Sequence, residues 1–125
     1  MKELTKAEEQ VMHIMWELGK STVKDIIDHI PDPKPAYNTI STIVRILENK
    51  GFVDHEPFGK GYIYFPLIGK SNYTRSYLKN IVSNYFNGSV KELVSFFARE
   101  DKLDIKEMEE LLDELKENSE NKNNM

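Results

Sequence analysis

Residues 35–51 read PAYNTISTIVRILENKG, and their apolar positions decide the fold of the first half of the chain. Four aliphatic side chains recur at i, i+3, i+4 and i+7, the spacing that lines one side of an α-helix: Ile40, Ile43, Val44 and Leu47. Pro35 suits the entry to such a helix, and Gly51 can adopt the left-handed conformation just past its end. The pattern predicts a helix that stops before Gly51 and packs one face inward.

The opposite face of this predicted helix carries short polar side chains around one arginine. Its members are Asn38, Ser41, Thr42, Arg45 and Asn49, and none of them is acidic. Such a face suits a DNA groove, because bases offer hydrogen-bond donors and acceptors while phosphates repel negative charge. The same composition also fits an ordinary solvated face, so this helix alone leaves both interpretations open.

Two further helices are predicted before it. Thr5-Lys6-Ala7-Glu8 has the form of a capping box and begins a helix that Gly19 ends. Ser21 or Thr22 then caps a second amphipathic helix. The run Pro31-Asp32-Pro33-Lys34-Pro35 ends this helix, because proline cannot continue the hydrogen-bond ladder.

After Gly51 the apolar period changes from that of a helix to that of a strand. Extended runs at residues 52–56 and 62–67 flank a tight turn at 58–61, with Lys60 at its tip. Three short helices followed by a hairpin is the order of a winged helix-turn-helix, in which the third helix reads DNA. We therefore predict a mainly α fold with a small β-hairpin wing, and a winged-helix DNA-binding domain over residues 1–70.

Residues 71–117 are expected to form a three-helix dimerisation domain. Short amphipathic helices gain most by packing against the same helices of a second chain, which gives a two-fold homodimer. The candidate dimerisation residues are Tyr77, Leu78, Ile81, Val82, Tyr85, Leu93, Phe97, Leu111, Leu112 and Leu115. Folding back onto the N-terminal domain is the alternative. Residues 118–125 are polar and free of aromatics, and are predicted to be a disordered tail.

Composition bounds these interpretations. At 125 residues the chain suits one compact domain, or a small domain plus an assembly segment. It has no cysteine, which excludes disulfides and thiolate metal sites. No stretch approaches the roughly 18–20 apolar residues that span a bilayer. We therefore expect a cytoplasmic protein without direct membrane insertion.

Net charge does not by itself favour a nucleic-acid partner. The formal charge is −4, of which residues 1–70 contribute −1 and residues 71–125 contribute −3. Phosphate contacts must therefore come from locally placed cations. The candidates are Lys34, Arg45, Lys50, Lys60, Arg75 and Lys79.

The chain as a whole resembles the BlaI/MecI family of winged-helix regulators, the penicillinase and methicillin-resistance repressors. The likeness covers residues 4–116 and is carried by LTKAEEQVMHIMW, TVKDIIDHI, YNTISTIVRILENKGFV, GYIYFPL and SVKELVSFFARED. It implies a homodimer that holds a palindromic operator in double-stranded DNA and blocks transcription of resistance genes and often of its own gene. It also implies that Thr39, Ser41, Thr42 and Arg45 face the DNA.

The sequence departs from the family's pattern in two places. In the resistance branch, derepression involves a membrane sensor-protease pathway and proteolysis inside the dimerisation region. The matching site here is Phe96-Phe97, but the asparagine that precedes that bond in the family is absent. Copper-responsive members carry a C-terminal cysteine metal motif, which is excluded in a chain without cysteine. The resemblance therefore leaves the inducing signal open.

The motifs give no support to an enzyme, and they predict neither a metal site nor a cofactor. His13, His29 and His55 are scattered without metalloprotease or triad spacing, and Gly59-Lys60-Gly61 is too short for a phosphate-binding loop. Two alternatives to a DNA-binding repressor stay open. One is a winged-helix protein-interaction module. The other is a regulator responsive to a small ligand, held between the two halves by Tyr62, Tyr64, Phe65, Tyr73 and Tyr77.

Overall fold

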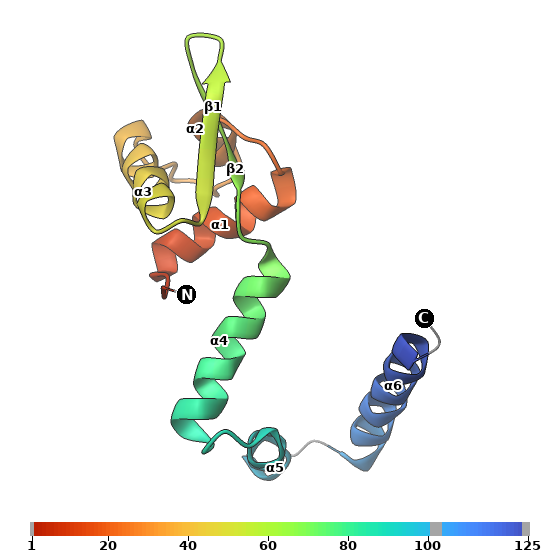
Figure 1. The fold of residues 1–125 in the computed structure, drawn as a ribbon. Coiled ribbons are helices and arrows are strands. Elements are labelled where there is room, and N and C mark those ends of the chain that lie inside the picture. Colours follow the sequence, from red (N-terminus) through yellow and green to blue (C-terminus); the bar gives the residue numbers. More distant parts are fainter. Residues whose placement is uncertain (1, 101–103, 124–125) are drawn as a thin grey trace. The chain divides into compact units, whose positions relative to one another are not determined.

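The computed structural model describes residues 2–100 and 104–123, and for residues 118–123 it describes the backbone alone. Within these residues the chain forms six helices and one two-stranded antiparallel sheet (Figure 1). This confirms the predicted fold class. The chain divides into two compact units, residues 1–78 and 79–125.

Three helices open the first unit: α1 (Lys6–Leu18), α2 (Val23–Asp28) and α3 (Tyr37–Asn49). Thr5 caps α1 and forms the predicted reciprocal box with Glu8. Thr22, rather than Ser21, caps α2 in the same way, with Asp25 as its partner. These caps satisfy amide groups that would otherwise lack partners, so the starts of both helices follow from local sequence.

The wing is a hairpin of β1 (Val53–Phe58) and β2 (Gly61–Pro66), which projects from the three helices of this unit (Figure 1). Pairing extends to Phe58 opposite Gly61, further than the predicted strand end at residue 56. The longer ladder is allowed by a two-residue turn, in which Gly59 has φ +60°. A positive φ at the first turn position and not at Lys60 is the type II′ arrangement that strand twist favours.

The hydrophobic core lies in the first unit. It is formed by Val11, Met12, Ile14, Met15, Val23, Ile26, Ile30, Ile40, Val44, Leu47, Phe52, Val53, Tyr64 and Tyr73. The predicted inward face of α3 is confirmed, because three of its four aliphatic residues are buried and Ile43 packs partly buried against them. Backbone hydrogen bonds between Ser21 and Tyr64, at 2.8 and 2.9 Å, tie the hairpin to the segment before α2.

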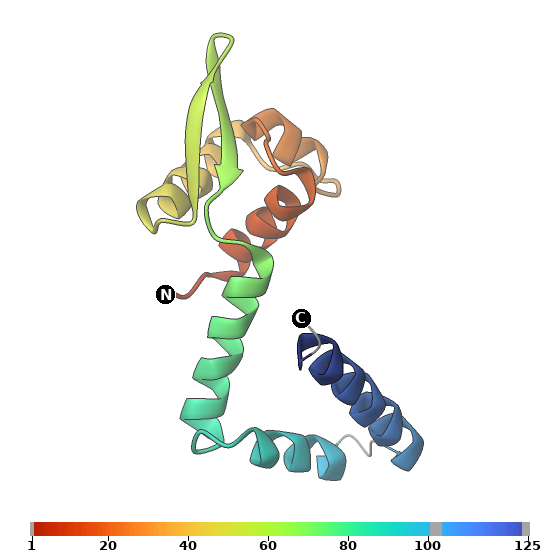
Figure 2. The same cartoon turned by 45° about the vertical axis from the view of Figure 1, so that its right-hand side comes forward.

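Helix α4 (Lys70–Tyr85) contributes Tyr73 to the core of the first unit, and its residues from Lys79 onward are assigned to the second (Figure 2). Tyr73 is buried against Trp16 and Phe52, with ring centroids 5.9 and 5.7 Å away. Trp16 also donates a 2.9 Å hydrogen bond from Nε1 to the Ile68 carbonyl. These contacts explain why the first unit reaches Leu78, beyond the domain boundary expected at residue 70.

The second unit also contains α5 (Val90–Glu100) and α6 (Ile105–Asn123). The predicted break after α4 is confirmed: Asn87 and Gly88 have φ of +53° and +76°, and the Ser89 hydroxyl accepts a hydrogen bond from the Glu92 amide. The expected disordered tail is wrong for residues 118–123, because α6 continues through them to Asn123. This stretch, NSENKN, is rich in asparagine, but it continues a helix that is already nucleated, so each added residue gains a hydrogen bond without a new nucleation step. Residues 124 and 125 lie outside the described residues.

Candidate nucleic-acid interface

The outward face of α3 is exposed as the sequence predicts, with one exception. The exposed members are Asn38, Thr39, Thr42, Arg45 and Asn49. None of these side chains carries a negative charge, and Arg45 is the one cation among them. The face therefore offers several hydrogen-bonding groups and one guanidinium to a ligand.

Ser41 is the exception, because only 7% of its surface is exposed. The expectation that Ser41 lies on the open face is wrong. It lies one turn before Arg45, and its Oγ accepts a 3.2 Å hydrogen bond from Nη2 of that arginine. Position 41 is three residues before the buried Val44, so it lies at the edge of the inward face. The serine thus restrains the guanidinium that the face presents.

The N-terminus of α3 has no side-chain cap. Ala36 stands at the capping position and its side chain cannot accept a hydrogen bond. The Thr39 amide donates to the Ala36 carbonyl at 3.1 Å, so the amides of Tyr37 and Asn38 are the ones left to bind an anion at the positive end of the helix dipole. Lys34 does not add a free charge here, since its Nζ donates to the carbonyls of Ile30 and Asp28 at 2.7 and 3.1 Å.

The C-terminus of α3 is fixed by a largely buried ion pair. Lys50 Nζ bonds Glu8 Oε1, and the two side chains are 23% and 7% exposed. Burial raises the pKa of Glu8, but the hydrogen bonds from Lys50 and Thr5 outweigh burial and hold that pKa below its ordinary value of 4.5. Lys50 is therefore engaged within the protein, which is contrary to its expected role as a phosphate contact.

The wing presents Lys60, which is exposed in its two-residue turn. Lower on the hairpin, Lys20 joins Glu56 by a 2.7 Å ion pair, with Lys20 59% and Glu56 48% exposed. Lys20 also lies 5.8 Å from the centroid of the Phe65 ring. These contacts link β1 and β2 to the segment after α1, and they leave the cation at the tip unpaired among the residues the structure describes.

A groove of 360 Å³ runs between α3 and the wing. It is lined by Arg45, Glu48, Asn49, His55, Tyr62 and Tyr64. Burial raises the pKa of Tyr64, and the negative charge of Glu48 adds to this rise while Arg45 opposes it. The groove thus brings the arginine of α3 and a carboxylate together beside the wing. Sequence reasoning missed the contribution of Glu48 and His55, which come from different elements.

The ten candidate dimerisation residues are all at least partly exposed in the single chain. Seven are exposed, and Ile81, Val82 and Leu93 are half-buried. Among the residues the structure describes, none from the second unit belongs to the hydrophobic core. Helix α5 has no buried residue, although it is strongly amphipathic. The described residues of the single chain therefore leave most of this apolar surface exposed.

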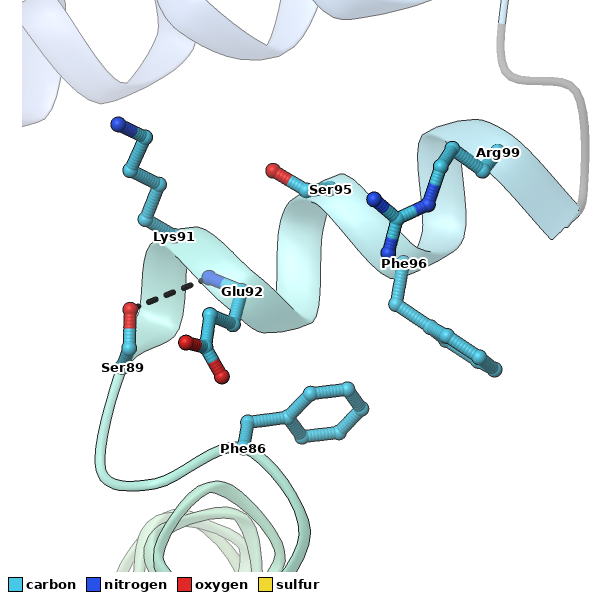
Figure 3. Close-up of a pocket in the computed structure, with 7 residues that line it drawn as sticks. All are labelled: Phe86, Ser89, Lys91, Glu92, Ser95, Phe96 and Arg99. Atoms are coloured by element: carbon cyan, nitrogen blue, oxygen red, sulfur yellow. Dashed lines mark hydrogen bonds between the residues drawn. The ribbon is translucent and has the colours of Figure 1, made fainter.

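Phe96 and Phe97, the residues of the expected proteolytic site, lie inside α5 and are 44% and 47% exposed. The Phe96 ring lies 5.6 Å from the Phe86 ring, on the same side of the helix (Figure 3). The two rings line a 490 Å³ hollow together with Lys91, Glu92 and Arg99. The hollow has both polar and apolar walls.

Four of the five aromatic residues of the small-ligand alternative line two separate hollows. Tyr62 and Tyr64 line the groove beside α3, whereas Tyr73 and Tyr77 line a 190 Å³ hollow with Trp16. These observations do not give the single pocket that the alternative requires. None of the described helices combines the length and the apolar character needed to cross a membrane.

Comparison with known proteins identifies the family of this chain. The family described as penicillinase repressor matches residues 4–117. Methicillin resistance regulatory protein MecI of Staphylococcus aureus strain N315 is 31% identical over 110 residues, covering 87% of this chain and 89% of MecI. The penicillinase repressor of Bacillus licheniformis is 26% identical over 121 residues, covering 96% and 94% of the two chains. A solved CopR repressor structure has a TM-score of 0.46 and 29% identity, covering 54% of this chain and 99% of its own. The chain therefore belongs to the penicillinase repressor family, whose members are transcriptional regulators and not enzymes.

Proposed function

We propose that this repressor acts as a homodimer that binds a palindromic operator, with α3 of each protomer in the major groove. The genes under control would be of the antibiotic-resistance type, together with its own operon. The single observation that carries the proposal is the exposed face of α3, which has hydrogen-bonding side chains and Arg45 but no carboxylate. On this account Asn38, Thr42 and Arg45 read base edges, with Thr39 and Asn49 at the margins.

Two features beside this face support the same placement. The uncapped amides at the start of α3 suit a phosphate, and contact with the backbone fixes the register of a recognition helix. Lys60 at the wing tip would contact a second phosphate, because its charge is exposed on a short rigid turn. The restraint of Arg45 by Ser41 lowers the entropy that the guanidinium loses when it binds a base.

Dimerisation is proposed for the second unit and the adjoining turn of α4. Its apolar side chains are exposed in the single chain, and isolated short helices are marginally stable in water. A second copy would bury Tyr85, Leu112 and their neighbours in a symmetric interface, and a palindromic operator would mirror that symmetry. We also propose that a membrane sensor-protease pathway acts on this unit, with the Phe96-Phe97 bond as the site to examine.

The test is fluorescence anisotropy of the purified protein with the DNA upstream of its own gene, with random DNA of equal length as the control. We expect preference for the upstream fragment, and a loss of affinity of about 1,000-fold or more between 50 and 200 mM salt if six or more phosphates are contacted. Equal and salt-insensitive binding of both fragments would refute operator recognition. It would favour a protein-interaction module.

Arg45→Ala tests the reading residue directly. We expect operator affinity to fall by about 1–3 kcal/mol, because one bidentate contact to a base is lost, while the dimer stays intact. Arg99→Ala, which removes an exposed arginine from α5, is the matched control and should leave affinity within about twofold, as surface substitutions usually change energies by less than 0.5 kcal/mol. Unchanged affinity of Arg45→Ala, with a normal sedimentation profile, would contradict the assignment.

A further inference from the structure

Three ligand-type side chains converge at the side of the groove between α3 and the wing. Glu48, Asp54 and His55 each offer one donor atom, and these three atoms lie within 4.8 Å of one another. Nδ1 of His55 lies 2.8 and 2.9 Å from the two carboxylate oxygens of Glu48. Within the described residues, this is the one group of three such side chains.

The backbone that carries these three side chains is fixed by buried residues. Glu48 lies in the last turn of α3, whereas Asp54 and His55 lie in β1. The intervening chain reverses at Gly51, which has φ +84°, and is anchored by the fully buried Phe52 and the nearly fully buried Val53. The His55 ring packs edge-on against Tyr62, with centroids 4.8 Å apart. The donor atoms are thus positioned by packed backbone.

We propose that Glu48, Asp54 and His55 bind a divalent transition metal ion of the zinc type, which bridges α3 and the wing. Zinc lies about 2.0–2.2 Å from nitrogen and oxygen ligands and is held by three protein groups plus water in open sites. The observed spread of donors fits one such ion after small side-chain rotations. The imidazole selects zinc over magnesium or calcium, which prefer oxygen ligands alone.

The negative charge of the two carboxylates is a second reason to expect a bound cation. Glu48 lines the groove together with Arg45, and Asp54 lies close to Glu48, so two carboxylates stand next to the proposed DNA-binding face. Negative charge at this place opposes DNA binding, and a bound dication would cancel it. We therefore expect zinc to strengthen operator binding. This second part rests on the proposed DNA-binding function, whereas the metal site does not.

The site is tested first without DNA, on the full chain. Zinc chloride is titrated into the protein while the imidazole resonances of all three histidines are followed by NMR, with calorimetry for stoichiometry. We expect one zinc ion per chain, with His55 signals shifting and those of His13 and His29 unchanged. Binding to His13 or His29 in place of His55, or no binding up to millimolar zinc, would overturn the proposal and leave Glu48 and His55 as a hydrogen-bonded pair only.

Variants sharpen this result. His55→Gln and Asp54→Asn should each weaken zinc binding at least tenfold while far-UV circular dichroism stays unchanged. His13→Gln is the matched control, because His13 lies 3.8 Å from Glu9 and is half exposed, yet that pair belongs to no such group of three among the described residues. Equal zinc affinity in His55→Gln and His13→Gln would overturn the assignment. Two separate ligand variants are used so that a folding defect in one of them leaves the other to test zinc binding.

The effect on DNA is then measured by anisotropy with zinc or with a chelator at constant ionic strength. We expect zinc to raise operator affinity severalfold in the native chain and to have no effect in His55→Gln. Operator affinity that is the same with and without zinc would overturn the coupling. If the chain binds zinc at His55 but no DNA in either condition, the metal site stands and the proposed DNA function fails.

Discussion

Replacing Lys50 with methionine breaks the ion pair that joins the end of α3 to the start of α1. Glu8 then remains in a site where 7% of its side chain is exposed, with a hydrogen bond from the Thr5 amide at 3.2 Å as remaining support. Removing one partner of a buried pair costs about 3–5 kcal/mol. Because Lys50 is itself 23% exposed, we expect a loss of about 2–3 kcal/mol, below that range.

The loss depends on pH in a defined direction. In the native chain the pKa of Glu8 lies below 4.5, so the pair stabilises fully above this pH and its contribution is lost as the pH falls through the lowered pKa. In Lys50→Met, burial acts on Glu8 without the lysine, which raises the pKa relative to the native chain. The difference in stability between the two proteins should therefore narrow as the pH falls through the interval between the pKa of Glu8 in Lys50→Met and its lower pKa in the native chain.

Urea denaturation followed by tryptophan fluorescence measures this difference. Trp16 is the single tryptophan and packs in the first unit against Tyr73, so its emission reports on that unit. Lys20→Met is the matched control: its pair with Glu56 is more than half exposed on the lysine side, and we expect a change of less than about 1 kcal/mol. Two results would refute the reasoning. One is an equal loss of unfolding free energy in Lys50→Met and Lys20→Met at pH 7, and the other is a difference between Lys50→Met and the native chain that stays constant from pH 7 to 3.5.

Three further predictions follow from single side chains. Ser41→Ala should weaken operator binding by about 0.5–1.5 kcal/mol in anisotropy, through loss of the hydrogen bond that restrains Arg45, and an unchanged affinity would show that the restraint is unimportant. Leu112→Glu should give a monomer in sedimentation velocity, since it introduces a charge into the proposed interface; a persistent dimer there, or in a chain truncated after Leu78, would place the interface elsewhere. Ser21→Ala should leave the free energy of unfolding unchanged or raise it by up to about 1 kcal/mol, because the buried hydroxyl has no hydrogen-bond partner within the described residues. The control is Thr22→Ala, which removes the adjacent helix cap and should lower the free energy of unfolding by about 1 kcal/mol in the same urea assay.

Local signals in the sequence were sufficient for most of the fold. The caps at Thr5 and Thr22, the apolar spacing in α3 and the glycines around the wing each act over a few residues, and the structure contains the helices and the hairpin that they predict. Residues 118–123 of α6 are the exception: their polar composition predicts disorder, but an existing helix can extend through them because its costly nucleation step has already been made.

The details of the candidate site could not be predicted, because they depend on residues far apart in the sequence. The sequence alone suggests that Lys50 is available to contact a phosphate, but in the structure it pairs with Glu8, which lies 42 residues earlier. Glu48 and His55 meet across a turn whose geometry is set by buried Phe52. Ser41 lies at the edge of the inward face, where helical periodicity alone does not separate a buried serine from an exposed one.

The distant pairing of α1 has a consequence during protein synthesis. Glu8 meets a partner 42 residues later in the chain, Trp16 a partner 52 residues later, and the core is completed by Tyr73. Domains fold as units while the ribosome extends the chain. A nascent chain therefore exposes the apolar side of α1 until Tyr73 has left the exit tunnel, and this interval is when chaperones and proteases have access to it.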